Sequence, residues 1–520
     1  MSDDMKVEYI IIQAGGMGTR MGGLTRNRPK ALVPVRNLPI IFQLFRKFPH
    51  SKFLIIGDYK AEVLERYLRT FSKADYLLIR SKGKGNAAGV RDALAFLPDD
   101  SPFMLVWSDI LFSDEYRIPE TKKECYVGIF HGVPCSWQFR DGCLEKMPAA
   151  ASGVAGCFLF DHKGRLQALP SEGSFTRWLS KSRIPLTAME MEGSVEVGTC
   201  DALRKVDSGE NRCRPYNHME FSADRVVKTG LTEEGKALIA REARWYEKVT
   251  EYGFQGSPRI YSLSPLTMER IRGDNIFRAN LDDAEKRRTI RRLVETLETL
   301  HHYEKVSPDY FDLQRDYYTK TMERIQGIRE VVPFTNRQYI TINGKKCKNI
   351  FFFEKELEQA VREMLFDTEF GLIHGDCTLT NTMIDAEGKI YFIDARGYFG
   401  SSELFGDVYY DWAKLYYSIQ GSFDQFNVKN FELEIAEESG QEGSDVRFAI
   451  ASSGWEHLTS YFLEQIPDCN IGKIKLIHAI VWMSLASHCW EDYDSMCLAF
   501  YNGVYLWNEW MEEYGKSFPV

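Results

Sequence analysis

The sequence predicts a two-part α/β protein, in which a mainly parallel sheet is followed by a few further strands and a helical C-terminal part. Up to about residue 200, short apolar runs alternate with segments of helical spacing such as AEVLERYLRTF and NAAGVRDALAFL. This β-α-β alternation is typical of a parallel sheet covered on both faces. The apolar runs are YIIIQ, FLIIG, YLLIR and FMLVW.

The expected order of strands and helices changes from about Met219 onward. A strand pair is expected around MEFSADRVVKTG, followed by an amphipathic helix at LTEEGKALIAREARWYEKV. A loop-and-strand block, GLIHGDCTLTNTMIDAEGKIYFIDARG, then gives way to mostly helical sequence. At 520 residues the chain exceeds one ordinary core, so two or three domains are expected.

Composition restricts the partners and the compartment. The balance of 65 Lys and Arg against 74 Asp and Glu gives a formal net charge of −9, which argues against an extended nucleic-acid groove. Eleven cysteines without a C-x-x-C pair argue against structural zinc and a disulfide framework, and favour a reducing cytoplasm. The acidic start MSDDMKVEYIII is unlike a secretory signal. IHAIVWMSLASHCW is too short and too interrupted to cross a bilayer, so no stable membrane insertion is expected.

A glycine-rich turn directly follows the first expected strand. In AGGMGTRM the backbone N–H groups of residues without a Cβ can approach a phosphate chain closely. Arg20 follows the turn, and Lys30 in RPKAL can reach the same phosphates as a point charge. The opening stretch therefore predicts a triphosphate-binding turn.

The joint pattern AGGMGTRM…RPKALVPV resembles the nucleotidyltransferases that join a nucleoside triphosphate to a sugar phosphate or phosphocholine. The resemblance implies a Rossmann-like domain in which Lys30 and Arg20 are catalytic. It also implies that magnesium binds Asp109 of LVWSDILF and Glu196 of VEVGT, a segment in which the family has W-x-D-x-G-T. LEKMPAAASGVAG is similar to the family's E-K-P element and G-x-x-G strand. The further binding residues implied are Gly15, Gly16, Gly18, Gly85 and Asn86 for the nucleotide, and Lys146 and Gly153 for the acceptor.

A second chemical motif lies in HGDCTLTN, which begins at His374, and in FIDARG. Asp376 can orient or deprotonate a hydroxyl, and Asn381 and Asp394 can hold magnesium, which are the requirements of phosphoryl transfer from ATP. This sequence is similar to the H-G-D-x-x-x-x-N motif of the aminoglycoside and choline kinase family. The resemblance implies a bilobal, protein-kinase-like domain with Asp376 as catalytic base.

The same resemblance extends to both sides of this motif. It implies that Lys228 holds the ATP phosphates, with Glu242 as its helical ion-pair partner. Met268 and Glu269, in the strip that ends at Ile271, would receive adenine. Asp411 in YYDWAKL would be a scaffold for the catalytic loop. The expected domains are therefore 1–207, a linker at 208–218, and 219–520, with a small lobe at 219–272 and a large helical lobe at 273–520.

Together the two resemblances imply a bifunctional enzyme that uses Mg²⁺ at both sites, ATP, and CTP or UTP. It would phosphorylate a small metabolite and then transfer a nucleotidyl group to the product, giving a precursor such as a nucleotide sugar for capsule or lipopolysaccharide. The alternatives are a choline kinase joined to a CTP:phosphocholine cytidylyltransferase, and a chain in which one half is a non-catalytic binding module. For choline, Trp490, Tyr493, Trp507 and Trp510 could form an aromatic box, although aromatic residues at helical spacing are more often core.

Overall fold

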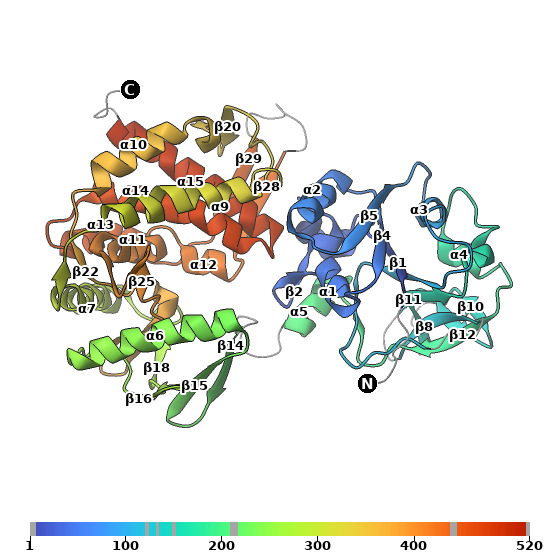
Figure 1. Ribbon diagram of the computed structural model, residues 1–520, viewed down its shortest axis with the longest axis horizontal. Coiled ribbons are helices and arrows are strands. Elements are labelled where there is room, and N and C mark those ends of the chain that lie inside the picture. Colours follow the sequence, from blue (N-terminus) through green and yellow to red (C-terminus); the bar gives the residue numbers. More distant parts are fainter. Residues whose placement is uncertain are drawn as a thin grey trace. The chain divides into compact units, whose positions relative to one another are not determined.

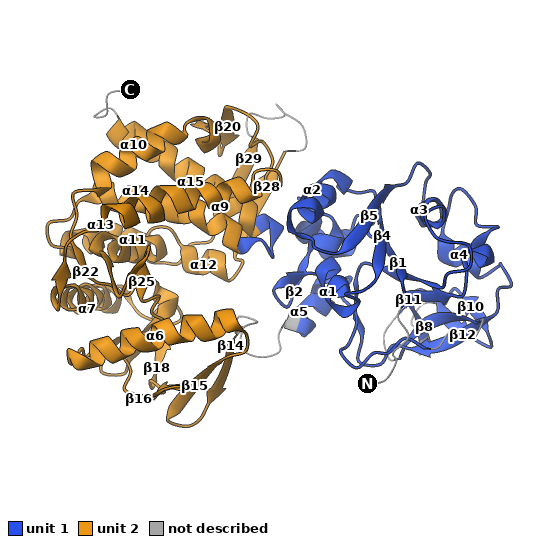
Figure 2. Ribbon diagram, in the orientation of Figure 1, with its two compact units in different colours: residues 1–210, 489–494 blue, residues 211–488, 495–520 orange. Residues whose placement is uncertain are grey.

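The computed structural model describes residues 7–119, 124–131, 135–147, 152–207, 217–436 and 445–515. The chain forms two compact units (Figure 2). Unit 1 comprises Met1–Glu210 and Cys489–Asp494, and unit 2 comprises Asn211–His488 and Ser495–Val520. Of the expected linker 208–218, residues 208–216 lie outside the described residues.

Unit 1 is built on a nine-stranded sheet with helices on its faces (Figure 1). Its parallel half is centred on β1 (Tyr9–Gln13), which pairs with β4 (Lys52–Gly57) and β6 (Phe103–Trp107), while β5 (Asp75–Arg80) pairs with β4. This half confirms the predicted α/β class. The other half is mixed, because β11 runs antiparallel to β6 and to β8. Its strands are β8 (Cys125–His131), β9 (Gln138–Arg140), β10 (Cys143–Glu145), β11 (Ser152–Phe160) and β12 (Leu186–Glu190).

The core of unit 1 follows from the apolar pattern of these elements. Ile10, Ile11 and Ile12 are all fully buried, because β1 is covered on both faces. The amphipathic helix α2 buries Leu64 and Leu68 at helical spacing. The helices are α1 (Ile40–Lys47), α2 (Ala61–Phe71), α3 (Asn86–Leu94), α4 (Phe175–Leu179) and α5 (Cys200–Asp207). The short pieces are η1 (Thr19–Thr25), η2 (Lys30–Leu32), η3 (Lys163–Leu166), β2 (Pro34–Val35), β3 (Leu38–Pro39), β7 (Ile110–Leu111) and β13 (Val195–Glu196).

A late segment of the chain, Cys489–Asp494, belongs to unit 1. The ring of Trp490 packs 5.6 Å from that of Phe42. The buried guanidinium of Arg28 forms an ion pair with Asp492. A buried arginine requires such a counter-charge, so this segment completes the packing of unit 1.

Unit 2 begins with an antiparallel sheet and one long helix. β14 (Asn217–Phe221) and β15 (Arg225–Gly230) form the strand pair that the sequence predicts. β17 (Leu266–Glu269) and β16 (Ile260–Leu263) extend the sheet in the order β14-β15-β17-β16. Helix α6 (Glu233–Glu251) begins where Thr232 accepts a hydrogen bond from the backbone N–H of Gly235.

The rest of unit 2 is mainly helical, as the sequence predicts. Its helices include α7 (Asp283–His302), whose start has a capping box formed by Asp282 and Glu285. The other helices are α8 (Tyr310–Leu313), η4 (Gln314–Thr319, a π-helix), α9 (Lys320–Ile328), η5 (Ile350–Phe352), α10 (Glu354–Leu365), η6 (Leu379–Asn381), α11 (Val408–Ile419), α12 (Phe423–Asn427), η7 (Glu456–Leu458), α13 (Thr459–Gln465), α14 (Ile471–Leu485), η8 (Ala486–Cys489) and α15 (Tyr493–Tyr514).

Short strand pairs among these helices flank the loops that contain the candidate site residues of unit 2. The hairpin β23 (Thr382–Asp385) and β24 (Ile390–Phe392) pairs with β18 (Gly273–Asn275). The other short strands are β19 (Lys305–Val306), β22 (Phe370–Leu372), β25 (Tyr398–Phe399), β26 (Ser402–Glu403) and β27 (Phe405–Asp407). A four-stranded sheet that the sequence does not predict is formed by β20 (Tyr339–Ile342), β21 (Lys345–Lys348), β28 (Phe431–Ile435) and β29 (Val446–Ile450).

Helix α14 contains most of the apolar stretch IHAIVWMSLASHCW. It is buried on almost every side within unit 2, which explains its uniformly apolar sequence. Of the helices in the described parts of the chain, none combines the length and apolarity that crossing a bilayer requires.

Candidate active sites

The glycine-rich turn after β1 contains positions where a side chain would not fit. Gly18 has a φ of 63°, and a Cβ there would lie 2.8 Å from Cγ2 of Thr25. A Cβ on Gly15 would lie 2.8 Å from the Cβ of Asp58. A Cβ on Gly16, by contrast, would have no atom within 4 Å. Protein atoms therefore pack against the turn at Gly15 and Gly18, whereas the space beside Gly16 is open. A phosphate chain could approach the backbone of the turn there.

Three predicted side chains of unit 1 converge beside this turn. β7 and β13 pair with Ile110 opposite Glu196, which brings Glu196 next to Asp109. A Cβ placed on Gly198 would lie 2.7 Å from Oδ2 of Asp109, 2.8 Å from Oε1 of Glu196 and 2.9 Å from Nζ of Lys30. Lys30 and Asp109 form an ion pair. Gly198 is thus required because the three charged groups leave no room for a side chain.

Each of the two carboxylates of this site faces a cationic side chain, Asp109 facing Lys30 and Glu196 facing Arg20. Burial and the charge of Asp109 raise the pKa of Glu196, and Arg20, whose Nη2 lies 3.1 Å from Glu196 Oε1, acts in the opposite direction. Two neighbouring carboxylates are oxygen donors of the kind that Mg²⁺ prefers. In the described parts of the chain no group of three or more His, Cys, Asp or Glu side chains could hold a metal ion.

The other residues expected in unit 1 lie on separate elements. Gly85 precedes α3 with a φ of 88°, and a Cβ there would lie 2.4 Å from the carbonyl oxygen of Gly173. Asn86 accepts a hydrogen bond of 2.8 Å from the backbone N–H of Phe175, so its side chain already links α3 to α4. Lys146 is exposed after β10, whereas Gly153 is buried in β11. The structure does not bring Lys146 into contact with the Lys30 site.

In unit 2, the lysine expected to hold ATP lies between two acids. Lys228 on β15 donates to Glu242 on α6 at 2.6 Å and also pairs with Asp394, which lies two residues after the end of β24. Burial acts to lower the pKa of Lys228, but the charges of Asp394 and Glu242 outweigh it and raise that pKa. The Asp394 side chain is half exposed and its φ is 59°, in the left-handed region that Asp tolerates. One cation thus links the small sheet, α6 and the β23–β24 hairpin.

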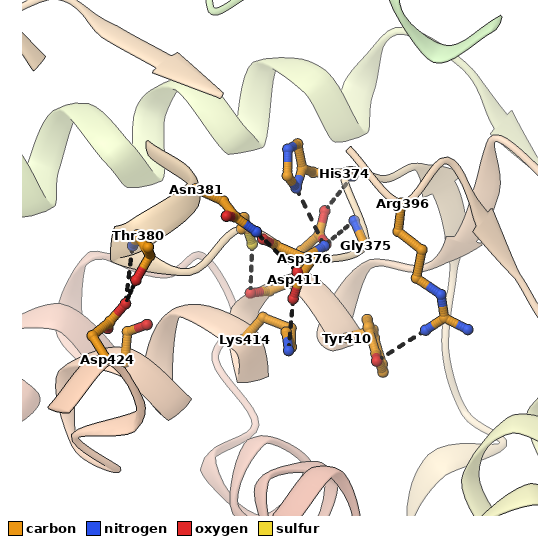
Figure 3. A network of polar contacts seen from close by, with 12 residues as sticks. His374, Gly375, Asp376, Thr380, Asn381, Arg396, Tyr410, Asp411, Lys414 and Asp424 are labelled. Carbon is orange, nitrogen blue, oxygen red and sulfur yellow. Dashed lines mark hydrogen bonds and ion pairs between the residues drawn. The ribbon is translucent and has the colours of Figure 1, made fainter. Parts of the chain in front are cut away.

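Asp376 and Asn381 lie together in the adjoining loop (Figure 3). The amide nitrogen of Asn381 donates to the carbonyl oxygen and to Oδ2 of Asp376, at 2.9 Å each. Asp411, fully buried on α11, accepts the backbone N–H groups of His374 at 2.8 Å and Gly375 at 2.7 Å. The carboxylate of Asp411 therefore holds the backbone of this loop in place. Asn381 and Asp394 supply the amide and carboxylate oxygens that fit Mg²⁺.

The residues expected to receive adenine lie on the neighbouring strand of the small sheet. Met268 is buried on β17, opposite Val226 of β15. The backbone N–H of Glu269 donates to the carbonyl oxygen of Arg259 at 2.8 Å. They share a ladder with Lys228, so the structure gathers this set on one sheet.

Comparison with known proteins matches one family model to part of each unit. The family model for nucleotidyl transferases matches residues 9–120, and the model for the phosphotransferase enzyme family matches residues 220–431. The chain joins a nucleotidyl transferase domain to a phosphotransferase-family domain. We use these two names for units 1 and 2 below.

Curated relatives match only part of the nucleotidyl transferase domain. "Bifunctional protein GlmU" of Methanococcus maripaludis is 32% identical over 107 residues, which is 20% of this chain and 25% of that protein. The chain thus spans about a quarter of the GlmU proteins that it matches. A 2-aminoethylphosphonate cytidylyltransferase of Lancefieldella rimae is 29% identical over 140 residues, covering 25% of this chain and 54% of that protein.

Solved structures also match this part of the chain at low identity. The inositol-1-phosphate CTP transferase of T. maritima is 14% identical with a TM-score of 0.33, covering 39% of this chain and 98% of that one. The CTP:phosphocholine cytidylyltransferase of Streptococcus pneumoniae is 18% identical with a TM-score of 0.32, covering 38% and 97%.

The phosphotransferase domain contains a further charged residue that the sequence did not single out. Nζ of Lys414 lies 2.7 Å from Oδ1 of Asp376, and its side chain is 10% exposed. Its ammonium also lies 4.7 Å from the ring centroid of Tyr417. Lys414 follows Asp411 by one helical turn on α11, and that spacing was the signal available in YYDWAKL.

Of the four aromatic residues considered for a choline box, Trp490 and Tyr493 belong to unit 1, whereas Trp507 and Trp510 belong to unit 2. Trp507 and Trp510 are fully buried in α15, and Trp510 donates its indole N–H to the carbonyl oxygen of Gly472. Trp490 belongs to the nucleotidyl transferase domain, where it packs on Phe42. Tyr493 is also buried. These rings are packing residues, as the commoner pattern predicts.

Proposed function

We propose that the chain is a bifunctional enzyme that phosphorylates a small hydroxyl compound with ATP and then attaches a nucleotidyl group to the product. One observation carries this proposal: each domain holds a converging set of cations, acids and backbone turns suited to its own nucleotide. In the nucleotidyl transferase domain the set is Arg20, Lys30, Asp109 and Glu196. In the phosphotransferase domain it is Lys228, Glu242, Asp376, Asn381 and Asp394.

In the phosphotransferase step, the acceptor hydroxyl oxygen attacks the γ-phosphorus of ATP while the bond from γ-phosphorus to the β–γ bridging oxygen breaks, and ADP leaves. Asp376 orients the hydroxyl and accepts its proton. Lys228 holds the phosphates of ATP, and Glu242 keeps that lysine in place at 2.6 Å. Magnesium, held by Asn381 and Asp394, would neutralise phosphate charge in this site.

In the nucleotidyl transfer step, an oxygen of the acceptor phosphate attacks the α-phosphorus of the second nucleotide. The bond between that phosphorus and the α–β bridging oxygen breaks, and pyrophosphate leaves with its electrons. Lys30, Arg20 and the N–H groups of the glycine turn stabilise the charge that accumulates on the phosphates. Magnesium bound by Asp109 and Glu196 would act as a Lewis acid here.

We propose a sugar or related polyhydroxy compound as the acceptor and CTP or UTP as the second nucleotide, giving a precursor for surface glycans such as capsule or lipopolysaccharide. A second candidate is cytidylyl transfer to an aminoalkyl phosphate or phosphonate, including the phosphocholine alternative. The Lancefieldella rimae relative, a 2-aminoethylphosphonate cytidylyltransferase, favours this candidate.

The test uses the full chain with ATP, Mg²⁺ and a panel of sugars, polyols, hydroxy acids, ethanolamine and choline. We expect ADP to form with one compound class in the absence of CTP and UTP. Pyrophosphate should form only after that product has accumulated. Pyrophosphate release from an unphosphorylated acceptor would overturn the order of steps, and the absence of one activity with an intact fold would favour a binding role for that domain.

A further inference from the structure

Three cations of the phosphotransferase domain gather around one buried carboxylate. Asp316, Lys320 and Arg324 are spaced at intervals of four along η4 and α9, so they share one helical face. Arg396 reaches the same place from the loop after β24, with its Nη2 at 3.6 Å from Oδ1 of Asp316. Lys320 pairs with the same carboxylate. We call Lys320, Arg324 and Arg396 the cationic cluster.

The charge of this cluster is not balanced by its own acid. Among the described residues, Asp316 is the acid that forms ion pairs with Lys320 and Arg396, whereas Arg324 donates to Oγ of Ser484 at 2.7 Å. Three positive groups therefore face Asp316, while the next buried carboxylate along the helix, that of Asp312, accepts hydrogen bonds from Ser401 and Ser402. Burial and the neighbouring arginines outweigh Asp316 and lower the pKa of Lys320 to about 8. Partly buried cations held together in this way are stabilised by an added anion.

The cluster adjoins the catalytic loop. A Cβ on Gly375 would lie 3.0 Å from the Cβ of Arg396, so the arginine packs on the residue that precedes Asp376. Nη1 of Arg396 also lies 3.0 Å from the hydroxyl oxygen of Tyr410, to which it donates. Tyr410 and Lys414 lie one turn apart on α11, and Lys414 contacts Asp376. Figure 3 shows this row from Arg396 through Tyr410 to Lys414 and Asp376.

Solvent reaches the cluster. The side chain of Lys320 is 21% exposed and that of Arg396 is 17% exposed. The Asp376 side chain is 35% exposed. Both the catalytic aspartate and two members of the cationic cluster are thus accessible to solvent.

We propose that the cationic cluster binds an anionic group of the phosphoryl acceptor, so that the phosphotransferase domain acts on a hydroxyl compound that carries a carboxylate or a phosphonate. This inference rests on the proposed phosphotransferase activity and narrows its substrate class. The two guanidinium groups can each bind such a group in a bidentate manner. A quaternary ammonium such as choline would be repelled by the same charges.

The test measures ADP formation by the full chain with matched acceptors. The pairs are D-glycerate against glycerol, gluconate against glucose, and 2-hydroxyethylphosphonate against ethylene glycol, with choline as the cationic compound. We expect at least one anionic member to exceed its neutral partner about tenfold or more in kcat/KM. The carboxylate and phosphonate pairs distinguish the two kinds of anion. Equal use of both members of every pair, or a preference for choline, would overturn the proposal.

Variants then locate the preference. Lys320→Met and Arg324→Met should each raise the KM for the anionic acceptor about tenfold and leave the KM for ATP unchanged, and Lys320→Arg should retain the preference. Arg315→Met is the matched control, because Arg315 lies on η4, directly before α9, but is exposed. Equal losses with anionic and neutral acceptors, or a raised KM for ATP, would instead indicate a structural or ATP-binding role.

A binding measurement separates this proposal from the proposed function. Without ATP, D-glycerate, gluconate or 2-hydroxyethylphosphonate should raise the melting temperature of the full chain, and Arg324→Met should abolish that rise. If no acceptor supports ADP formation but this specific stabilisation persists, the phosphotransferase activity is wrong and the anion site stands. If both are absent, both proposals are wrong.

Discussion

At the scale of single residues, charge determines what each side chain of the catalytic loop can do. Asp376 contacts both Asn381, at 2.9 Å, and Lys414, at 2.7 Å, so an amide and an ammonium fix the orientation of its carboxylate. Asp376 and Asn381 were evident from HGDCTLTN, whose spacing is local. The ion pair with Lys414 was not, because it joins residues from a loop and a helix that are distant in the sequence.

Replacement of Lys414 tests its role as a positioning residue. We expect Lys414→Met to lower kcat for ADP formation on the order of 10²-fold with little change in the KM for ATP, because the carboxylate of Asp376 loses its orientation. Lys414→Arg should restore part of kcat. Single-turnover kinetics with the same acceptor provide the measurement. An unchanged kcat in a folded Lys414→Met variant would exclude this role.

The pH dependence of acceptor use should report on Lys320. Its pKa is lowered to about 8 by burial and by Arg396 and Arg324, against the effect of Asp316. The ammonium is therefore charged below about pH 8 and becomes neutral above it, so kcat/KM for an anionic acceptor should fall as the pH rises from 7 to 9. A neutral acceptor should not show this fall. Lys320→Arg should remove it, since a guanidinium stays protonated throughout this range; persistence of the fall in that variant would assign it to another group.

At the scale of elements, the turn after β1 shows how local sequence prepares a site. The glycines were predicted to leave room for a phosphate chain, and the structure adds a distinction between them. Gly18 and Gly15 accommodate neighbouring atoms of the protein, whereas Gly16 has no neighbour within 4 Å of an added Cβ. The sequence alone does not separate these two causes, since both select the same residue.

Two alanine substitutions separate the causes. Gly18→Ala should lower the free energy of unfolding by about 1–2 kcal/mol, because alanine at a φ of 63° is strained and its Cβ would lie 2.8 Å from Thr25. Gly16→Ala should leave stability almost unchanged but raise the KM for the second nucleotide, because its methyl group would point into the open space. Chemical denaturation and pyrophosphate release measure the two effects. The reverse pattern would show that the ligand approaches at Gly18.

Other elements show which parts of the fold local sequence patterns predict and which parts they do not. The β-α-β alternation and the helix α6 are predicted well, because apolar spacing is set within a few turns of chain. The sheet of β20, β21, β28 and β29 is not predicted from the sequence. In it, β20 pairs in parallel with β29 through a single register position, Ile342 opposite Val446. Such pairing depends on contacts between segments separated by several helices.

At the scale of the whole molecule, the two sites belong to different compact units and should fail independently. Asp376→Asn should lower ADP formation about 10²-fold or more, since the hydroxyl loses its orienting and proton-accepting carboxylate. It should leave pyrophosphate release from a pre-formed phosphoacceptor intact. Asp109→Asn should have the opposite pattern, because its carboxylate contacts Lys30 in the other unit.

Coupled assays of ADP and pyrophosphate on the same folded preparations measure both patterns. Arg315→Met, on the exposed side of the phosphotransferase domain, is a charge-removing control for both activities. Loss of both activities in either variant would mean that the two steps share one composite site.

The sequence by itself determined that the chain carries two nucleotide-handling domains, because the glycine turn, RPKAL, HGDCTLTN and FIDARG are short motifs whose geometry is local. Only the tertiary structure decided which charges meet: Lys30, Asp109 and Glu196 around Gly198, Lys414 beside Asp376, and three cations around Asp316. It also showed that Trp507 and Trp510 are fully buried packing residues of α15. The physical reason is that Coulomb energies and burial depend on distances in space, and those distances are fixed by the packing of elements that lie far apart in the sequence.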